Sequence, residues 1–336
     1  MRKMRKFKIG YRTLKTAVGA PLAIFLAQMF GLNNFVSAGI ITVLCIQVTK
    51  KKSLKSAWAR FFACLTGMVF SSLFFEIIGY HPIVIGILLL FFIPTMVLCK
   101  TTEGIVTSTV IILHLYAAGQ INWGIIQNEF LLVITGIGVA LLMNLYMPSL
   151  ENDLILYRDK IEENFAVIFE NIVAFLREGD MNWDGKEITE TASLLEKAKG
   201  LALRNVENQL LRNEDLYYIY FKMREKQFEI IERVLPTFAM MTTNVEQAKL
   251  IADFIEELKN NIHSGNTANK FLKKLQNMRK KMEETPLPKT REEFETRASL
   301  YHFLFEMEQY LIIKSQFKGL PNTKSAKKNH AKRKEK

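Results

Sequence analysis

The chain has 336 residues, of which 49% are hydrophobic, and a formal net charge of +12. The first 149 residues carry 13 basic and three acidic side chains, residues 150–321 are slightly acidic, and residues 322–336 are strongly basic. A basic excess that lies beside apolar blocks and in a tail argues against nucleic acid as a partner. The three cysteines, Cys45, Cys64 and Cys99, lie in apolar blocks without CxxC spacing, which argues against a disulfide framework or a metal site.

Six apolar blocks separated by short connections fill residues 1–149. A helix that crosses the hydrocarbon layer needs roughly 20 apolar residues. The second and fifth blocks are short, but omitting either would break the alternation of basic connections described below. The sequence therefore predicts an all-α fold that begins with a six-helix transmembrane bundle. The blocks are Tyr11–Phe30, Asn34–Thr49, Ala57–Ile78, Pro82–Cys99, Gly104–Ala118 and Phe130–Met147.

Basic residues near the blocks set the orientation, because Lys and Arg are retained on the cytoplasmic side. They occur in the amino-terminal arm, at Lys50–Lys52 with Lys55, and at Lys100, whereas the first, third and fifth connections hold none. With six spans, this pattern predicts a multi-pass protein of the cell (plasma) membrane with both termini cytoplasmic. The basic tail at 322–336 is expected to be disordered, and either to contact anionic membrane lipid or to stay solvated.

Residues 150–321 have the pattern of amphipathic helices, which predicts a second, cytoplasmic all-helical domain of five or six helices. Its first apolar stripe repeats at three, four and seven residues, as one face of a helix does. We expect this domain to fold by itself, with the first stripe available for dimerisation. The stripe consists of Leu154, Ile161, Phe165, Ile168, Ile172 and Phe175.

Sequence signatures of catalysis are missing. The chain has no GxxxxGK[ST] phosphate loop, no GxGxxG, no HExxH and no GxSxG. His263 and His302 lie in the helical part, but no nucleotide-binding motif follows them. We therefore expect no enzymatic activity, no cofactor and no catalytic residues.

Ionisable residues inside the apolar blocks are the candidates for function, because such residues are costly in a membrane. Lys15 and Arg60 lie about one turn into the first and third blocks, Glu103 at the inner edge of the fifth, and His114 in its outer half. Lys15 and Arg60 also have the alternative of reaching the cytoplasmic headgroups. Glu76 and Glu129 mark outer ends, where an interfacial position is the simpler interpretation.

The two short blocks are the middle members of two triplets, which indicates an inverted 3+3 repeat, although no residue-by-residue repeat accompanies it. Short segments at corresponding positions of two halves point to a transport site. Gln47 and Thr49 belong to the first of them. Small residues at i, i+4 and i+8 mark packing faces, within one subunit or between two, so a homo-oligomer, most simply a dimer, is expected. These faces are Ala63, Gly67 and Ser71, and Gly136, Ala140 and Asn144.

Two stretches carry a family resemblance: the opening Gly10–Ala17, and Gln47–Ser53 continuing to Arg60 and Gly67. Together with six apolar blocks and a helical carboxy-terminal part, they resemble the bacterial aromatic acid exporter family, relatives of fusaric acid resistance proteins. The resemblance extends to about Gly319 and matches the Gram-positive type with a cytoplasmic helical domain. Many relatives have Pro where this chain has Val48. The resemblance implies efflux of aromatic carboxylates.

The sequence thus predicts a membrane transporter-like protein that exports aromatic or other organic carboxylates. Lys15, Arg60 and the lysines at 50–52 would attract the anion, Gln47 and Thr49 would hydrogen-bond its carboxylate, and His114, with Glu103, would carry a coupled proton. We also assign His114 to the substrate-binding set. Two alternatives stay open: a passive organic-anion channel, and a non-transporting scaffold that recruits partners through its helical domain.

Overall fold

A computed structural model describes residues 10–179, 183–208, 216–238, 241, 245–263, 265 and 268–320, and within these ranges the chain is all-α. It forms two compact units, whose main boundary falls between Pro148 and Ser149. Each unit is considered by itself below. The basic tail at 322–336 lies outside the described residues.

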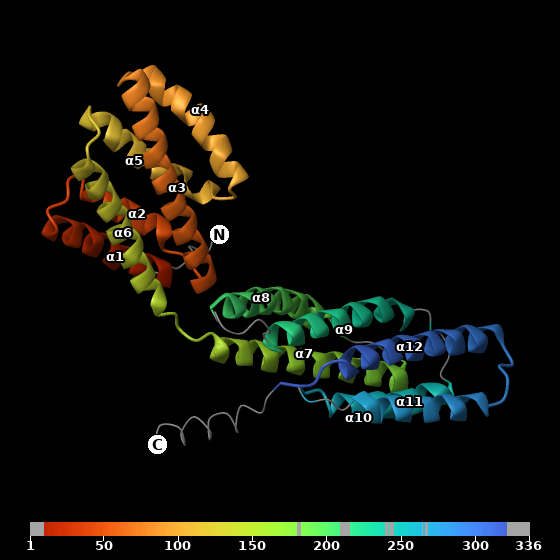
Figure 1. Cartoon of the computed structure of the whole chain (residues 1–336). Helices are drawn as coiled ribbons and strands as arrows, with labels where there is room; N and C mark the ends of the chain where they lie inside the picture. The colour runs from red at the N-terminus through yellow and green to blue at the C-terminus, as the bar shows by residue number, and fades with distance from the viewer. Residues whose placement is uncertain are drawn as a thin grey trace, which may run out of the picture. The chain divides into compact units, whose positions relative to one another are not determined.

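The first unit contains six α-helices and one 3₁₀ turn (Figure 1). Helix α3 packs against α4, α5 and α6, and α2 packs against both α1 and α6. Two of the helices, α3 and α6, are long and apolar enough to cross a membrane, and α2, α4 and α5 are shorter apolar helices. The elements are α1 (Tyr11–Met29), α2 (Val36–Cys45), α3 (Lys50–Ile78), α4 (Pro82–Leu98), η1 (Thr102–Gly104), α5 (Ile105–Ala118) and α6 (Trp123–Leu145).

Two of these helices start earlier than the apolar pattern predicted. Helix α3 begins at Lys50 rather than near Ala57, because Thr49 caps it by accepting a hydrogen bond from the backbone N–H of Lys52. Helix α6 begins at Trp123 rather than near Phe130, because Asn122 Oδ1 accepts from the N–H of Ile125 at 2.9 Å. The lysines at 50–52 therefore lie on a helix and not in a connection.

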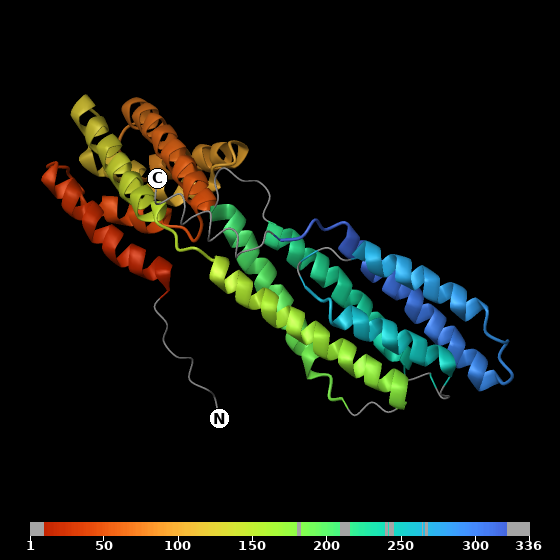
Figure 2. The same ribbon diagram turned by 90° about the horizontal axis from the view of Figure 1, so that it is seen from below.

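The second unit contains the remaining six α-helices of the described residues (Figures 1 and 2). Helix α7 does not continue directly from α6, because Tyr146–Leu150 is non-helical around Pro148, which disfavours helix at the residue before it. Helix α7 packs against α10, and α12 against α9 and α11. The helices are α7 (Glu151–Glu178), α8 (Lys186–Asn208), α9 (Leu216–Phe238), α10 (Glu246–Lys259), α11 (Ala268–Glu283) and α12 (Arg291–Ser315).

The first apolar stripe of α7 faces the core of this unit. Leu154, Ile161, Phe165 and Ile168 are fully buried, and Phe175 packs edge-on against Phe238 with ring centroids 5.4 Å apart. The expected dimerisation through this face is therefore wrong, because α9 and other helices of the same unit already cover it.

A buried arginine links two helices of the second unit, α7 and α9. Arg224 of α9 is 0% exposed, and its guanidinium donates to Tyr220 Oη at 3.0 Å, Gln227 Oε1 at 3.1 Å and Glu162 Oε1 at 3.3 Å. Tyr220 Oη also donates to Glu162 Oε1 at 2.6 Å. Because Glu162 belongs to α7 and supplies the negative charge, the arginine has the ion pair that a buried cation requires.

We expect residues 149–320 to fold as an isolated fragment whose stability depends on Arg224. Arg224→Leu leaves Glu162 without its counter-charge, so the free energy of unfolding should fall by about 3–5 kcal/mol. Arg177→Leu, which removes an exposed ion pair with Asp253 and Glu256, is the matched control and should change little. Chemical denaturation followed by circular dichroism measures both. A fragment with coil-like spectra, or equal losses for the two variants, contradicts the expectation.

Lys314 of α12 lies beside this cluster and is 3% exposed. Burial, with repulsion by Arg224, lowers its pKa to about 7, and attraction by Glu162 opposes this only in part. The exposed His263 has its pKa lowered as well, first by partial burial and then by Lys314. The unfolded chain therefore binds a proton at Lys314 that the folded unit does not hold, over the window between about pH 7 and the ordinary lysine pKa.

Because the unfolded state takes up this proton, the free energy of unfolding should decrease as the pH falls toward 7, by up to ~1.4 kcal/mol per pH unit from this residue alone. Below about pH 7 both states are protonated, and the dependence should level off. Lys314→Met should raise stability at pH 7 and flatten the curve between pH 7 and 9. Parallel curves for the two proteins over that range would contradict the lowered pKa.

Candidate functional site

Arg60 of α3 is buried inside the first unit among hydroxyl groups. It is 7% exposed, and it donates from Nε to Ser56 Oγ at 3.2 Å and from Nη1 to Thr107 Oγ1 of α5 at 2.6 Å. The turn before α5 comes very close to α3, since a Cβ on Gly104 would lie 2.4 Å from Ala63 Cβ. This close approach brings Thr107 within reach of the guanidinium.

Lys15 of α1 forms a second buried cation. It is 6% exposed, and Nζ donates to Asn144 Oδ1 of α6 at 3.3 Å and approaches Met147 Sδ at 3.2 Å. Asn144 in turn donates from Nδ2 to Ser53 Oγ of α3 at 2.7 Å. The amide of Asn144 therefore links Lys15 to α3.

One face of α3 carries Arg60 and also Ser53, the serine to which Asn144 links Lys15. Ser53, Ser56 and Arg60 follow at three and four residues, the spacing that places side chains on the same side of a helix. At 1.5 Å per residue, this polar face covers roughly 10 Å of α3. Among the described residues, neither Lys15 nor Arg60 forms an ion pair with a carboxylate; their partners are hydroxyl, amide and thioether groups and, for Lys15, the ring of Tyr11.

A different polar group joins α2, α5 and α6. His114 Nδ1 lies 2.8 Å from Glu129 Oε2, and His114 Nε2 lies 3.1 Å from Ser37 Oγ. Glu129 is 1% exposed, and its other oxygen accepts from Asn128 Nδ2 at 3.1 Å. Glu129 is thus not an interfacial residue but the buried partner of the histidine.

The segment before α2 is fixed to the same group through Asn128. Its side chain accepts from the backbone N–H of Asn33 at 2.7 Å and donates to the carbonyl oxygen of Asn33 at 3.2 Å. These two hydrogen bonds join the α1–α2 connection to α6. The amide of Asn128 therefore links Glu129 to this connection.

The other predicted site residues occupy different places. Gln47 Nε2 donates only to the carbonyl of Leu44 among the described residues, at 3.3 Å, and Thr49 is a buried helix cap. Glu103 is exposed in η1. It precedes α5, whereas His114 lies ten residues into that helix, so roughly 14 Å of helix separates them. The structure does not bring together the predicted proton pair of Glu103 and His114.

Two residues of the site were missed as functional candidates. Glu129 was read as interfacial because the apolar pattern starts at Phe130, yet an Asn122 cap signal seven residues earlier places it inside a helix. Asn144 was read only as a packing residue. The sequence feature that indicates a further role is an amide side chain on the small-residue face of an apolar helix, where polar side chains form hydrogen bonds to neighbouring helices.

The small-residue faces are used within the unit. A Cβ on Gly136 would lie 2.7 Å from Ile41 Cβ of α2, and one on Gly67 would lie 3.3 Å from Ser108 Cβ of α5. These glycines therefore permit close helix packing inside one subunit and leave no surface for a second copy at these points.

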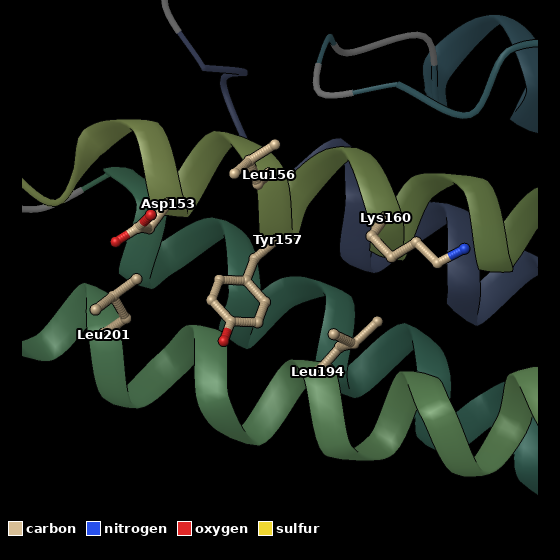
Figure 3. A pocket seen from close by; sticks show the side chains of 6 residues that line it. All are labelled: Asp153, Leu156, Tyr157, Lys160, Leu194 and Leu201. Atoms are coloured by element: carbon tan, nitrogen blue, oxygen red, sulfur yellow. The ribbon is translucent and has the colours of Figure 1, made fainter. Parts of the chain in front are cut away.

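A groove of about 480 Å³ lies in the second unit, between α7 and α8 (Figure 3). Leucine side chains and Tyr157 line it, with Asp153 and Lys160 at its polar positions. Lys160 is paired with Glu163 at 3.1 Å. None of the predicted site residues contributes to this groove.

The first unit thus combines apolar helices, two of them long and apolar enough to cross a membrane, with buried cations, and a second helical unit follows it. Residues 7–147 match the family model "Aromatic acid exporter family member 1", and residues 151–315 match "Putative aromatic acid exporter C-terminal domain". The chain belongs to the aromatic acid exporter family, as its sequence resemblance indicated.

Similar proteins occur in bacteria. The chain is 62% identical over 319 residues to "Uncharacterized protein YqjA" of Bacillus subtilis (strain 168), covering 95% of this chain and 99% of that protein. It is 27% identical over 229 residues to "UPF0421 protein YgaE" of the same organism, covering 65% and 61%. A crystal structure of a putative membrane protein from Clostridium difficile 630 aligns with 48% of this chain and 97% of that chain, at a TM-score of 0.43 and 22% identity.

Proposed function

We propose that this protein exports organic carboxylates, aromatic ones among them, across the cell membrane, and that the buried cations on the polar face of α3 bind the anion. The observation that carries this is the environment of Arg60: a buried guanidinium whose described partners are only the hydroxyls of Ser56 and Thr107. Burying a charge without a counter-charge costs several kcal/mol. A substrate carboxylate would supply that charge.

In this proposal helices α1–α6 span the membrane with both termini in the cytoplasm. Support comes from the basic residues at Lys50–Lys52, Lys55 and Lys100, which all fall on one side of such an arrangement. Helix α2 has only ten residues and ends in extended backbone at Ile46, whose carbonyl accepts from Arg12 Nε at 3.1 Å. Short, interrupted helices of this kind border substrate sites in many transporters.

The geometry suggests how the carboxylate is bound. A guanidinium binds a carboxylate through two parallel hydrogen bonds. Nη1 and Nε of Arg60 already donate to Thr107 and Ser56, and a carboxylate would replace one or both of these neutral acceptors. Lys15 of α1 is linked through Asn144 to Ser53, which lies about two turns from Arg60 along α3. It would provide a second positive charge on the route from the cytoplasm.

Replacing Arg60 with Gln should therefore reduce transport strongly. Truncating one member of a desolvated charge pair costs about 2–5 kcal/mol, a loss of roughly thirtyfold to several thousandfold. Lys15→Gln should also reduce transport. Lys55→Gln, at an exposed position on the same helix as Arg60, should do little. Uptake of labelled aromatic acids into everted membrane vesicles, at equal protein abundance, measures the effect.

The outcomes distinguish the candidates. If vesicles that contain the wild-type protein move no aromatic or aliphatic carboxylate above background, the exporter is ruled out and a scaffold is favoured. Transport that is indifferent to both Arg60 and Lys15 would refute the assignment of these residues alone. Transport by the wild-type protein that does not respond to a pH gradient would favour a passive anion channel.

The His114 and Glu129 pair is the best placed group for a coupled proton. Histidine changes charge near neutral pH, and here it contacts a buried carboxylate at 2.8 Å that can share or accept a proton. Protonation and deprotonation would change the bonds to Ser37 and Asn128, and so the attachment of α2 and of the connection before it.

Glu129→Gln and His114→Ala should each remove the dependence of transport on the pH gradient while leaving anion binding largely intact. The reason is that each variant removes one of the two titratable members but none of the cations. Glu76→Gln, at an exposed carboxylate near the end of α3, is the control and should keep the dependence. Vesicle uptake with and without an imposed gradient is the measurement. Retained dependence in both pair variants would refute the assignment.

A further inference from the structure

Helix α12 is apolar on two opposite faces. Its inner face is fully buried in the second unit and includes Leu300, Leu304 and Met307. Its outer face carries three large exposed aromatic side chains: Phe294 is 60% exposed, Tyr301 47% and Phe305 51%. Exposed aromatic residues that follow a single helix face indicate an interaction surface.

The outer residues have the spacing of a coiled-coil seam. Phe294 and Tyr301 are seven residues apart, Ala298 and Phe305 are also seven apart, and the two series are offset by four. This is the heptad pattern in which apolar positions alternate at three and four residues. At the ends of the seam lie Arg291, which is exposed, and Glu308.

We propose that the outer face of α12 binds a second copy of this chain, with the two α12 helices antiparallel and the two-fold axis between Ser299 and Leu300. In that register Phe294 of each copy lies opposite Phe305 of the other, and Ala298 lies opposite Tyr301. A large side chain thus meets a small one at the centre, with an aromatic pair on either side. Every contact occurs twice, as a two-fold interface requires.

Charge complementarity selects this partner and this direction. The same register places Arg291 of each copy opposite Glu308 of the other. In a parallel pair, Arg291 would face Arg291 and Glu308 would face Glu308, and like charges at facing positions are unfavourable. An anionic lipid surface fits less well, because the acidic side chains Glu295 and Glu308 lie beside the stripe and at its end.

Both end residues already have partners within their own chain. Arg291 Nε contacts Glu295 Oε1 at 2.9 Å, four residues on, and Glu308 Oε2 accepts from Arg279 Nη1 of α11 at 2.7 Å. The pair with Glu295 is exposed and imposes little constraint. Arg291 of the second copy would join Glu308 and Arg279 at the rim of the interface. This inference does not depend on the transport activity.

Cysteine cross-linking of the full-length protein in detergent tests the register. In a background with Cys45, Cys64 and Cys99 replaced by alanine, differently tagged Phe294→Cys and Phe305→Cys chains are co-expressed and oxidised. We expect a disulfide between the two variants. Phe294→Cys chains expressed alone should not cross-link. Position 294 of one copy would lie 11 residues along the helix, roughly 16 Å, from position 294 of the other. The reverse pattern, or a monomeric wild-type protein, would overturn the proposal.

Charge reversal tests the same interface independently. Arg291→Glu and Glu308→Arg chains, each expressed alone, place like charges opposite one another, so each homodimer should dissociate with a constant raised roughly tenfold or more. Co-expressed, the two variants place opposite charges together at both ends and should form a heterodimer in preference to either homodimer. Light scattering and tag co-purification measure this. Homodimers as stable as wild type, or no preference for the mixed pair, would overturn the proposal.

Discussion

The burial of charge among helices is the constraint on which the rest of this molecule depends, and the chain meets it in three ways. Arg224 in the second unit is surrounded by hydroxyl, amide and carboxylate acceptors, with Glu162 supplying the counter-charge. Glu129 is buried against a histidine, with His114 Nδ1 2.8 Å from Glu129 Oε2. The described partners of Arg60 and Lys15 are all uncharged.

The contrast between Arg224 and Arg60 is the reason for proposing a structural role for the first arginine and an anion-binding role for the second. Both are buried and both donate to side chains of neighbouring helices. Arg224 is charge-balanced, so removing it is expected to damage the fold. Arg60 has hydroxyl partners that orient the guanidinium but do not neutralise it, which is what a site for a transient anion requires. Burial alone would not have separated the two roles.

The sequence was sufficient to predict the helical class and most helix positions, because apolar periodicity reports them directly, and the family, because two sequence stretches resemble it. It was less reliable at helix starts, where a single capping side chain decides. Thr49 and Asn122 each begin a helix upstream of the apolar block, and the second of these places Glu129 inside α6. The pairing of His114 with Glu129 rather than Glu103 followed from that shift, and no spacing rule within α5 would have revealed it.

Apolar patterns also say which face of a helix is hydrophobic but not what covers it. The stripe on α7 and the outer stripe on α12 look equivalent in sequence, since both repeat at three and four residues. In the structure the α7 stripe is covered by other helices of its own unit, whereas Phe294, Tyr301 and Phe305 stay exposed. A helix that is apolar on two sides needs two partners, and within the described part of the second unit the outer aromatic side chains of α12 are contacted only in part, by Arg279 over the Tyr301 ring. The expectation of a dimer therefore shifts from α7 to α12, where size and charge are complementary under a two-fold axis.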